Sequence, residues 1–140
     1  MSDYVPLALR RLVTTRADGR CEYCRYPQAV AFLTFEVEHI IARKHGGQST
    51  DGNLVLACPF CNQAKGTDLA SLDPETGALT ALFNPRTDRW NEHFALAGTH
   101  LLGLTAIGRV TATLLQFNNP GRLTERELLI HAGMYDHADG

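Results

Sequence analysis

The chain has 140 residues, of which 44% are hydrophobic and 20% are charged, and its formal net charge is −2. This length and composition predict one compact domain with a buried core. The slightly negative overall charge gives no support for nucleic-acid binding and slightly opposes it, so any such surface must be local. No apolar run of about 18 residues occurs, and residues 1–6 lack the features of a secretory signal, so we expect a cytoplasmic protein that does not enter a membrane.

The first half of the chain is predicted to hold a helix, an extended segment, a loop and a second helix. Apolar residues at helical spacing indicate a short amphipathic helix over residues 6–15. The apolar and β-branched run 29–35, followed by alternating polar and apolar residues, predicts extended structure reaching Ile40. Residues 42–53 are polar and glycine-containing, which is typical of a loop, and a helix can follow near 61–65.

The second half is predicted to contain three short strands and two helices. A strand is expected at 78–83, and two more are expected around 94–97 and 100–104. Helical spacing of apolar residues predicts a helix over 106–117, capped by a threonine, and a last helix over 124–133.

Two Cys-x-x-Cys pairs stand 33 residues apart, Cys21 with Cys24 and Cys58 with Cys61. Two thiolates three positions apart can chelate one zinc ion, and a second pair completes the tetrahedral shell of a structural site. The alternatives are four buried cysteines that act as small hydrophobic residues, or one redox-active pair. A redox pair leaves the second Cys-x-x-Cys unexplained, so we predict a structural Zn²⁺ site.

An ordered set of residues lies between and just after these pairs. Glu38-His39 is followed by Gly46-Gly47, by Asn53 on the way to Cys58, and by the segment Asn62-Gln63-Ala64-Lys65-Gly66. In this order the features resemble the HNH endonucleases, and the resemblance covers about residues 16–68. It implies two antiparallel strands and a helix around a metal ion, the unit called a ββα-metal or His-Me finger.

The resemblance also implies roles for single residues. His39 matches the general base, and an imidazole can accept a proton from water near neutral pH. Glu38 and Asn62 match the residues that bind a catalytic cation, Mg²⁺ or Mn²⁺, through hard oxygen ligands. Asn53 matches a structural asparagine that braces the active-site loop. Some members use the motif histidine as a metal ligand, so that role for His39 stays open.

Three basic residues are candidates for contacts with DNA. Arg43 and Lys44 lie in the predicted loop, and Lys65 matches a lysine of the family motif. These side chains can neutralise phosphates, although solvated surface charge is the competing interpretation for each of them.

The sequence therefore predicts an α+β fold in which a zinc-held ββα-metal finger, residues 16–68, is followed by a small β-hairpin and helices in a C-terminal extension, residues 73–140. The whole chain, 1–140, is expected to be one nuclease domain that hydrolyses phosphodiester bonds in DNA. The alternative is a catalytically inactive zinc module that binds nucleic acid or a protein. Cutting both strands of a duplex would require either a homodimer, which supplies a second active site, or sequential nicks by one site.

Overall fold

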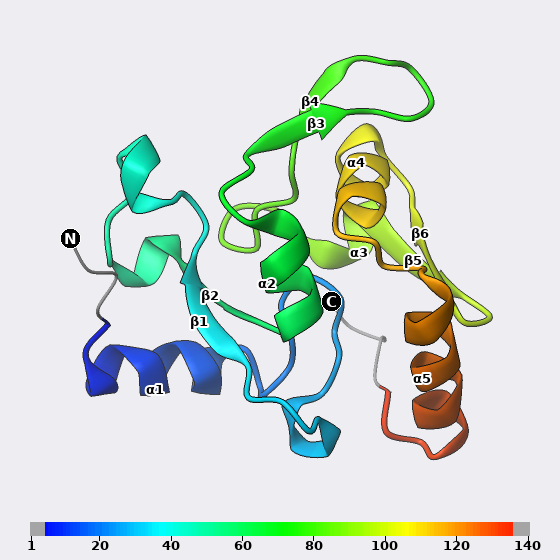
Figure 1. The fold of residues 1–140 in the computed structure, drawn as a ribbon, viewed down its shortest axis with the longest axis horizontal. Helices are drawn as coiled ribbons and strands as arrows, with labels where there is room; N and C mark the ends of the chain where they lie inside the picture. The colour runs from blue at the N-terminus through cyan, green and yellow to red at the C-terminus, as the bar shows by residue number, and fades with distance from the viewer. Residues whose placement is uncertain (1–4, 136–140) are drawn as a thin grey trace.

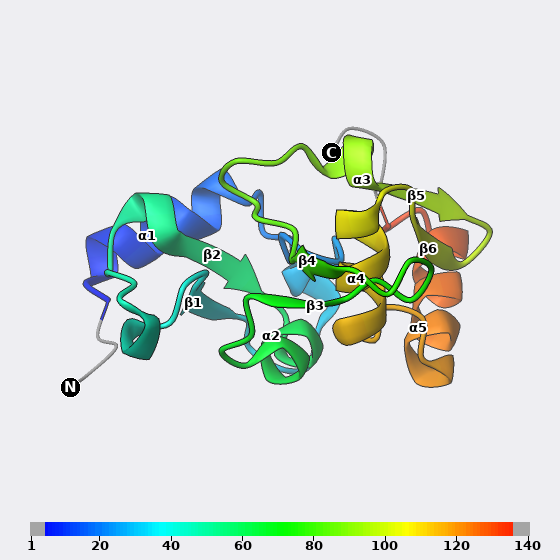
Figure 2. The same cartoon turned by 90° about the horizontal axis from the view of Figure 1, so that it is seen from above.

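The computed structural model describes residues 5–135, so both ends of the predicted domain 1–140 lie outside the described residues. The architecture is α+β, with three separate two-stranded antiparallel sheets and helices packed around them (Figure 1). The helix α1, Leu7–Arg16, lies at one end of the molecule and α5, Pro120–His131, lies at the other (Figures 1 and 2). No helix within the described residues is long and apolar enough to cross a membrane.

The first sheet and the helix after it form the ββα unit that the sequence predicted. The strand β1, Glu36–His39, pairs antiparallel with β2, Leu54–Ala57, in a register that sets His39 opposite Leu54. The helix α2, Pro59–Lys65, begins immediately after β2 because Cys58 caps it and Pro59 fits its first turn. The helix α1 packs against β2, and α2 packs against β1.

The prediction of extended structure over residues 29–35 is wrong. Gln28–Val30 form a 3-10 turn, and β1 begins only at Glu36. The physical reason lies in β2, which ends at Ala57 opposite Glu36 because the next residue turns away as a cysteine of the zinc site. Residues before 36 therefore have no strand to pair with.

Two hairpins follow the finger, whereas the sequence predicted one, and the first of them begins just before the predicted extension. In the first, β3, Ala70–Leu72, pairs with β4, Leu79–Ala81, and in the second, β5, Phe94–Ala97, pairs with β6, His100–Gly103. A short helix, α3, Trp90–His93, which the sequence did not predict, leads into β5.

The last two helices follow the second hairpin. The helix α4, Ala106–Leu114, starts at the predicted threonine cap, because the Thr105 side chain accepts a hydrogen bond from the Gly108 amide. It packs against both hairpins of the extension. The helix α5 begins at Pro120, earlier than predicted, because a proline is well suited to the first turn of a helix.

Finger and extension share their buried apolar side chains. One contiguous cluster runs from Val13 in α1, through Leu54 and Leu56 in the finger, to Phe94 and Phe117 in the extension. Such burial contributes on the order of 1.5–3 kcal/mol for each large side chain. The extension therefore packs on the finger as part of the same core.

Candidate metal centres and active site

The four cysteines meet in the interior. The Sγ atoms of Cys21, Cys24, Cys58 and Cys61 all lie within 4.8 Å of one another, and all four residues are buried. Each pair forms a tight turn in which the second amide points at the first sulfur, with N···S distances of 3.5 Å for Cys24 to Cys21 and 3.4 Å for Cys61 to Cys58. Such turns direct both sulfurs of a pair toward one point.

The spacing of the sulfurs fits zinc. A tetrahedral ion with Zn–S bonds of about 2.3 Å requires S···S distances of about 3.8 Å. The Sγ atoms of Cys24 and Cys58, one from each pair, lie 3.7 Å apart. Among the described residues, the cluster that could hold an ion consists of four thiols, a donor set that zinc favours and that leaves no position for a substrate. The four cysteines are therefore poised to bind a structural zinc ion.

A buried arginine from the extension reaches this cluster. Arg122, in α5, donates through one guanidinium nitrogen to the Sγ of Cys61 at 3.3 Å and lies 3.9 Å from the Sγ of Cys58. Burial of Arg122 opposes its charge, but the thiolates of Cys24, Cys61 and Cys58 raise the pKa of its guanidinium above the usual value. The positive charge is thus held beside sulfurs that become negative when they bind zinc.

A second group of polar residues lies where α2 faces β1. The Nδ2 atom of Asn62, on α2, donates to the Oε2 atom of Glu38, on β1, at 3.3 Å, and both residues are half-buried. Residues 24 positions apart in the sequence are joined because the zinc pairs fix α2 against the hairpin. The contact brings a carboxylate and a carboxamide side by side.

His39 follows Glu38 at the end of β1 and is also half-buried. Its Nε2 atom lies 2.8 Å from the Oγ atom of Ser49. Ser49 lies in the loop between the two strands, and the sequence analysis did not single it out. A hydroxyl two residues after a Gly-Gly pair carries no signal of its own, because the contact depends on how the loop folds back over β1.

Asn53 ties the ends of that loop together. Its Oδ1 atom accepts a hydrogen bond from the Ile41 amide at 2.9 Å, and its Nδ2 atom donates to the carbonyls of Ile41 at 3.0 Å and Gln48 at 2.9 Å. The loop also needs a glycine at position 47, because a Cβ atom there would lie 1.7 Å from the Ile41 carbonyl oxygen. The side chain of Asn53 thus sets the path of the chain between His39 and Ser49.

The basic residues divide into two groups. Arg43 and Lys44 are exposed on a 3-10 turn, Arg43–His45, in the loop after His39, where they can reach a phosphate. Lys65 is predicted to contact a phosphate, but the structure places it in the interior. It is 6% exposed, and its Nζ atom donates to the Ile40 carbonyl at 2.9 Å. Burial lowers the pKa of Lys65, although the carboxylates of Asp68 and Glu38 act in the opposite direction. In this position Lys65 fastens α2 to the end of β1.

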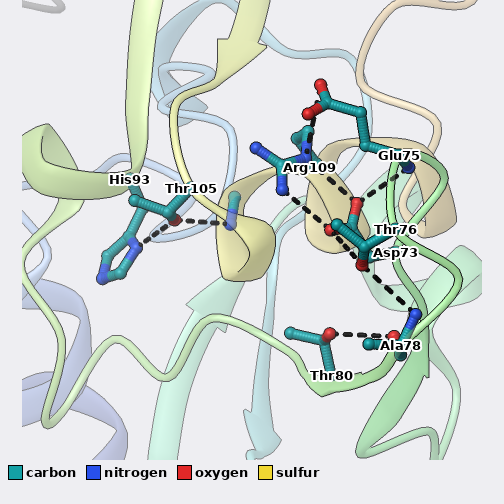
Figure 3. A network of polar contacts seen from close by, with 9 residues as sticks. Asp73, Glu75, Thr76, Ala78, Thr80, His93, Thr105 and Arg109 are labelled. Carbon is teal, nitrogen blue, oxygen red and sulfur yellow. Dashed lines mark hydrogen bonds and ion pairs between the residues drawn. The ribbon is translucent and has the colours of Figure 1, made fainter.

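The extension has a polar network of its own around α4 (Figure 3). Asp73 accepts two hydrogen bonds from Arg109 on α4, at 3.0 and 2.8 Å, and two more from the residues of the tight turn that follows it. The Arg109 guanidinium holds the pKa of Asp73 well below its usual range. His93 bonds to Thr105, the cap of α4, at 2.6 Å. These contacts fasten the hairpins to α4 and do not reach the Glu38–Asn62 contact.

Comparison with known proteins agrees with this geometry. Residues 21–68 match the family model of the HNH endonucleases. The chain is 26% identical over 129 residues to the Septu protein PtuB of Bacillus thuringiensis, an alignment that covers 91% of this chain and 46% of PtuB. A stretch of 52 residues, 36% of the chain, is 40% identical to the CRISPR-associated endonuclease Cas9 of Corynebacterium diphtheriae and covers 5% of that protein.

The chain thus spans about half the length of PtuB and a small part of Cas9. No solved structure matches it. The family match covers both cysteine pairs and the β1–β2–α2 unit between and after them. Residues 21–68 of this chain therefore match the HNH endonuclease domain, and the four clustered cysteines among them are poised to bind zinc.

Proposed function

We propose that the HNH domain hydrolyses phosphodiester bonds in DNA with the help of one divalent cation, Mg²⁺ or Mn²⁺. The observation that carries this proposal is the contact between Glu38 and Asn62, with His39 next to Glu38 in the chain, on a hairpin whose loop Asn53 braces. The similarity to an endonuclease supports it. Exposed Arg43 and Lys44 on the same loop add positive charge for a phosphate backbone.

Glu38 and Asn62 suit a hard cation. Two oxygens that bind adjacent positions of an octahedral Mg²⁺ ion lie about 3.0 Å apart, and the facing atoms of the two side chains lie at 3.3 Å. A half-turn of the Asn62 carboxamide exchanges its nitrogen for its oxygen and presents both residues as oxygen donors. When bound, such a cation neutralises charge on the scissile phosphate and on the leaving oxygen.

His39 is the proposed general base. With its Nε2 atom protonated and donating to Ser49, the ring presents an unprotonated Nδ1 atom that takes the proton from the attacking water. The contact with Ser49 orients the His39 ring, and the three hydrogen bonds of Asn53 hold the loop that carries Ser49. A metal-ligand role for His39 would use the same unprotonated Nδ1 atom, with the hydrogen bond between Nε2 and Ser49 kept.

The test is cleavage of supercoiled plasmid DNA by the zinc-loaded 140-residue chain, with and without added Mg²⁺ or Mn²⁺. The cation is omitted rather than chelated, because a chelator would also strip the structural zinc. General-base catalysis contributes about 10²–10⁴-fold, so His39→Ala should lose at least about 100-fold in rate with unchanged zinc content. His100→Ala, an exposed histidine on β6, is the matched control and should cleave at the wild-type rate.

The result that would overturn the proposal is cleavage by His39→Ala at the wild-type rate, or a wild-type protein that binds DNA without cutting it in any divalent cation. The second result would favour the inactive zinc module. Parallel reactions on single-stranded DNA and RNA define the substrate class. The cytoplasmic location stays a prediction, and the comparisons give the predicted homodimer no support.

A further inference from the structure

The helix α5 brings a buried positive charge to the zinc site from the far end of the chain. Arg122 is 8% exposed, and one of its nitrogens donates to the Leu115 carbonyl at 2.8 Å and to the Gln116 carbonyl at 3.2 Å. The other nitrogen faces the Sγ atoms of Cys61 and Cys58. The guanidinium is therefore held by two carbonyls in a fixed orientation toward the sulfurs.

This arginine stands at an unfavourable place in its own helix. Because α5 begins at Pro120, Arg122 lies in the first turn, where the helix dipole is positive and an acidic residue is preferred. A buried cation at this end costs stability unless something negative faces it. Zinc bound by four thiolates carries a net charge of about −2, which offsets both the helix dipole and the arginine.

The end of the same segment contacts the other cysteine pair. The hydroxyl of Tyr135, four residues after α5, donates to the carbonyl oxygen of Cys24. Tyr135 is buried, and the guanidinium of Arg126 lies 5.9 Å from its ring centroid. Residues 120–135 thus touch the Cys58–Cys61 pair at one end and the Cys21–Cys24 pair at the other.

We propose that Arg122 is a positioning residue of the zinc site that couples zinc retention to the docking of α5. The arginine holds the thiolates of Cys58 and Cys61 against dissociation, and the zinc-bound thiolates hold the first turn of α5 in place. Because such coupling is reciprocal, removal of either partner weakens the other. The coupling gives the C-terminal extension a role in the metal site that is independent of DNA cleavage.

The first test compares zinc release from two methionine variants of the full chain. Arg122→Met removes the charge near the sulfurs. Arg126→Met removes another buried arginine of the same helix, which instead bonds the carbonyls of Thr99 and Phe117, both at 2.7 Å. Loss of a partner of a metal ligand lowers metal affinity by about 10–100-fold. With excess chelator and a colorimetric zinc indicator, Arg122→Met should release zinc at least about 10-fold faster than Arg126→Met.

Two further measurements separate charge from packing. Arg122→Lys keeps the positive charge without the forked geometry, so its release rate should lie between those of wild type and Arg122→Met. In the wild-type chain, hydrogen exchange should speed up across residues 120–131 when zinc is removed and should slow again when zinc returns. This exchange experiment needs no variant, so it still decides the question if Arg122→Met does not fold.

Equal zinc release from Arg122→Met and Arg126→Met would overturn the proposal, because the effect would then reflect loosening of α5 alone. Release from Arg122→Lys as fast as from Arg122→Met would exclude a role for the charge. Exchange of α5 that does not respond to zinc would exclude the coupling.

Discussion

Replacing Asn53 should destabilise the HNH domain, whereas replacing Asn62 should not. Asn53→Ala removes three hydrogen bonds, at 2.9, 3.0 and 2.9 Å, that tie the loop to Ile41 and Gln48. Each intramolecular hydrogen bond contributes about 0.5–1.5 kcal/mol, and the low end applies because water can reach this loop. The free energy of unfolding should therefore fall by about 1.5–2 kcal/mol. Asn62→Ala loses one bond of 3.3 Å and should cost less than about 0.5 kcal/mol.

The assay is urea unfolding of the zinc-loaded variants, followed by the fluorescence of Trp90, the single tryptophan, which is buried. Asn53→Asp sharpens the test because it keeps the acceptor for the Ile41 amide but sets a carboxylate oxygen against two carbonyl oxygens. It should be at least as destabilised as Asn53→Ala. A wild-type stability for Asn53→Asp, or equal losses for Asn53→Ala and Asn62→Ala, would refute the assignment of Asn53 as the loop brace.

Three further predictions concern the loop and the extension. Ser49→Ala should lower the cleavage rate about 2–12-fold, because the His39 ring loses a hydrogen bond that orients it; an unchanged rate would remove Ser49 from the site. Gly47→Ala should destabilise the domain in urea through its clash, whereas Gly52→Ala, with open space around its Cα, should not; equal effects would contradict this. The ion pair of Asp73 with Arg109 contributes its full stabilisation above pH about 4, and this is lost as the pH falls through the lowered pKa of Asp73 in the folded state. In urea unfolding, the difference in free energy of unfolding between wild type and Asp73→Asn should therefore shrink below pH about 4. A difference that stays constant would contradict this.

Much of the finger could be predicted from the sequence because its determinants are local. The two Cys-x-x-Cys pairs fix the zinc site, and the proline after Cys58 marks the start of α2. The threonine cap of α4 was visible in the same way. In each case a short motif carries the geometry without help from distant residues.

The parts that the sequence missed depend on partners far along the chain. The apolar run 29–35 has the composition of a strand, but β2 ends before it can pair with it. The strand β3 is three residues long and is defined only by its pairing with β4. Lys65 matches a motif position, yet its ammonium group donates a hydrogen bond to the carbonyl of Ile40. The contact of Arg122 with the zinc cysteines spans about 60 residues, and no sequence pattern encodes it.

The most direct test of the account is the position of a bound Mn²⁺ ion. Crystals of the zinc-loaded chain soaked in Mn²⁺ should give an anomalous peak bonded to oxygen atoms of both Glu38 and Asn62, beside the His39 ring, in addition to the zinc peak at the four cysteines. An ion bound elsewhere, or no ion between Glu38 and Asn62 at saturating Mn²⁺, would contradict the proposed active site.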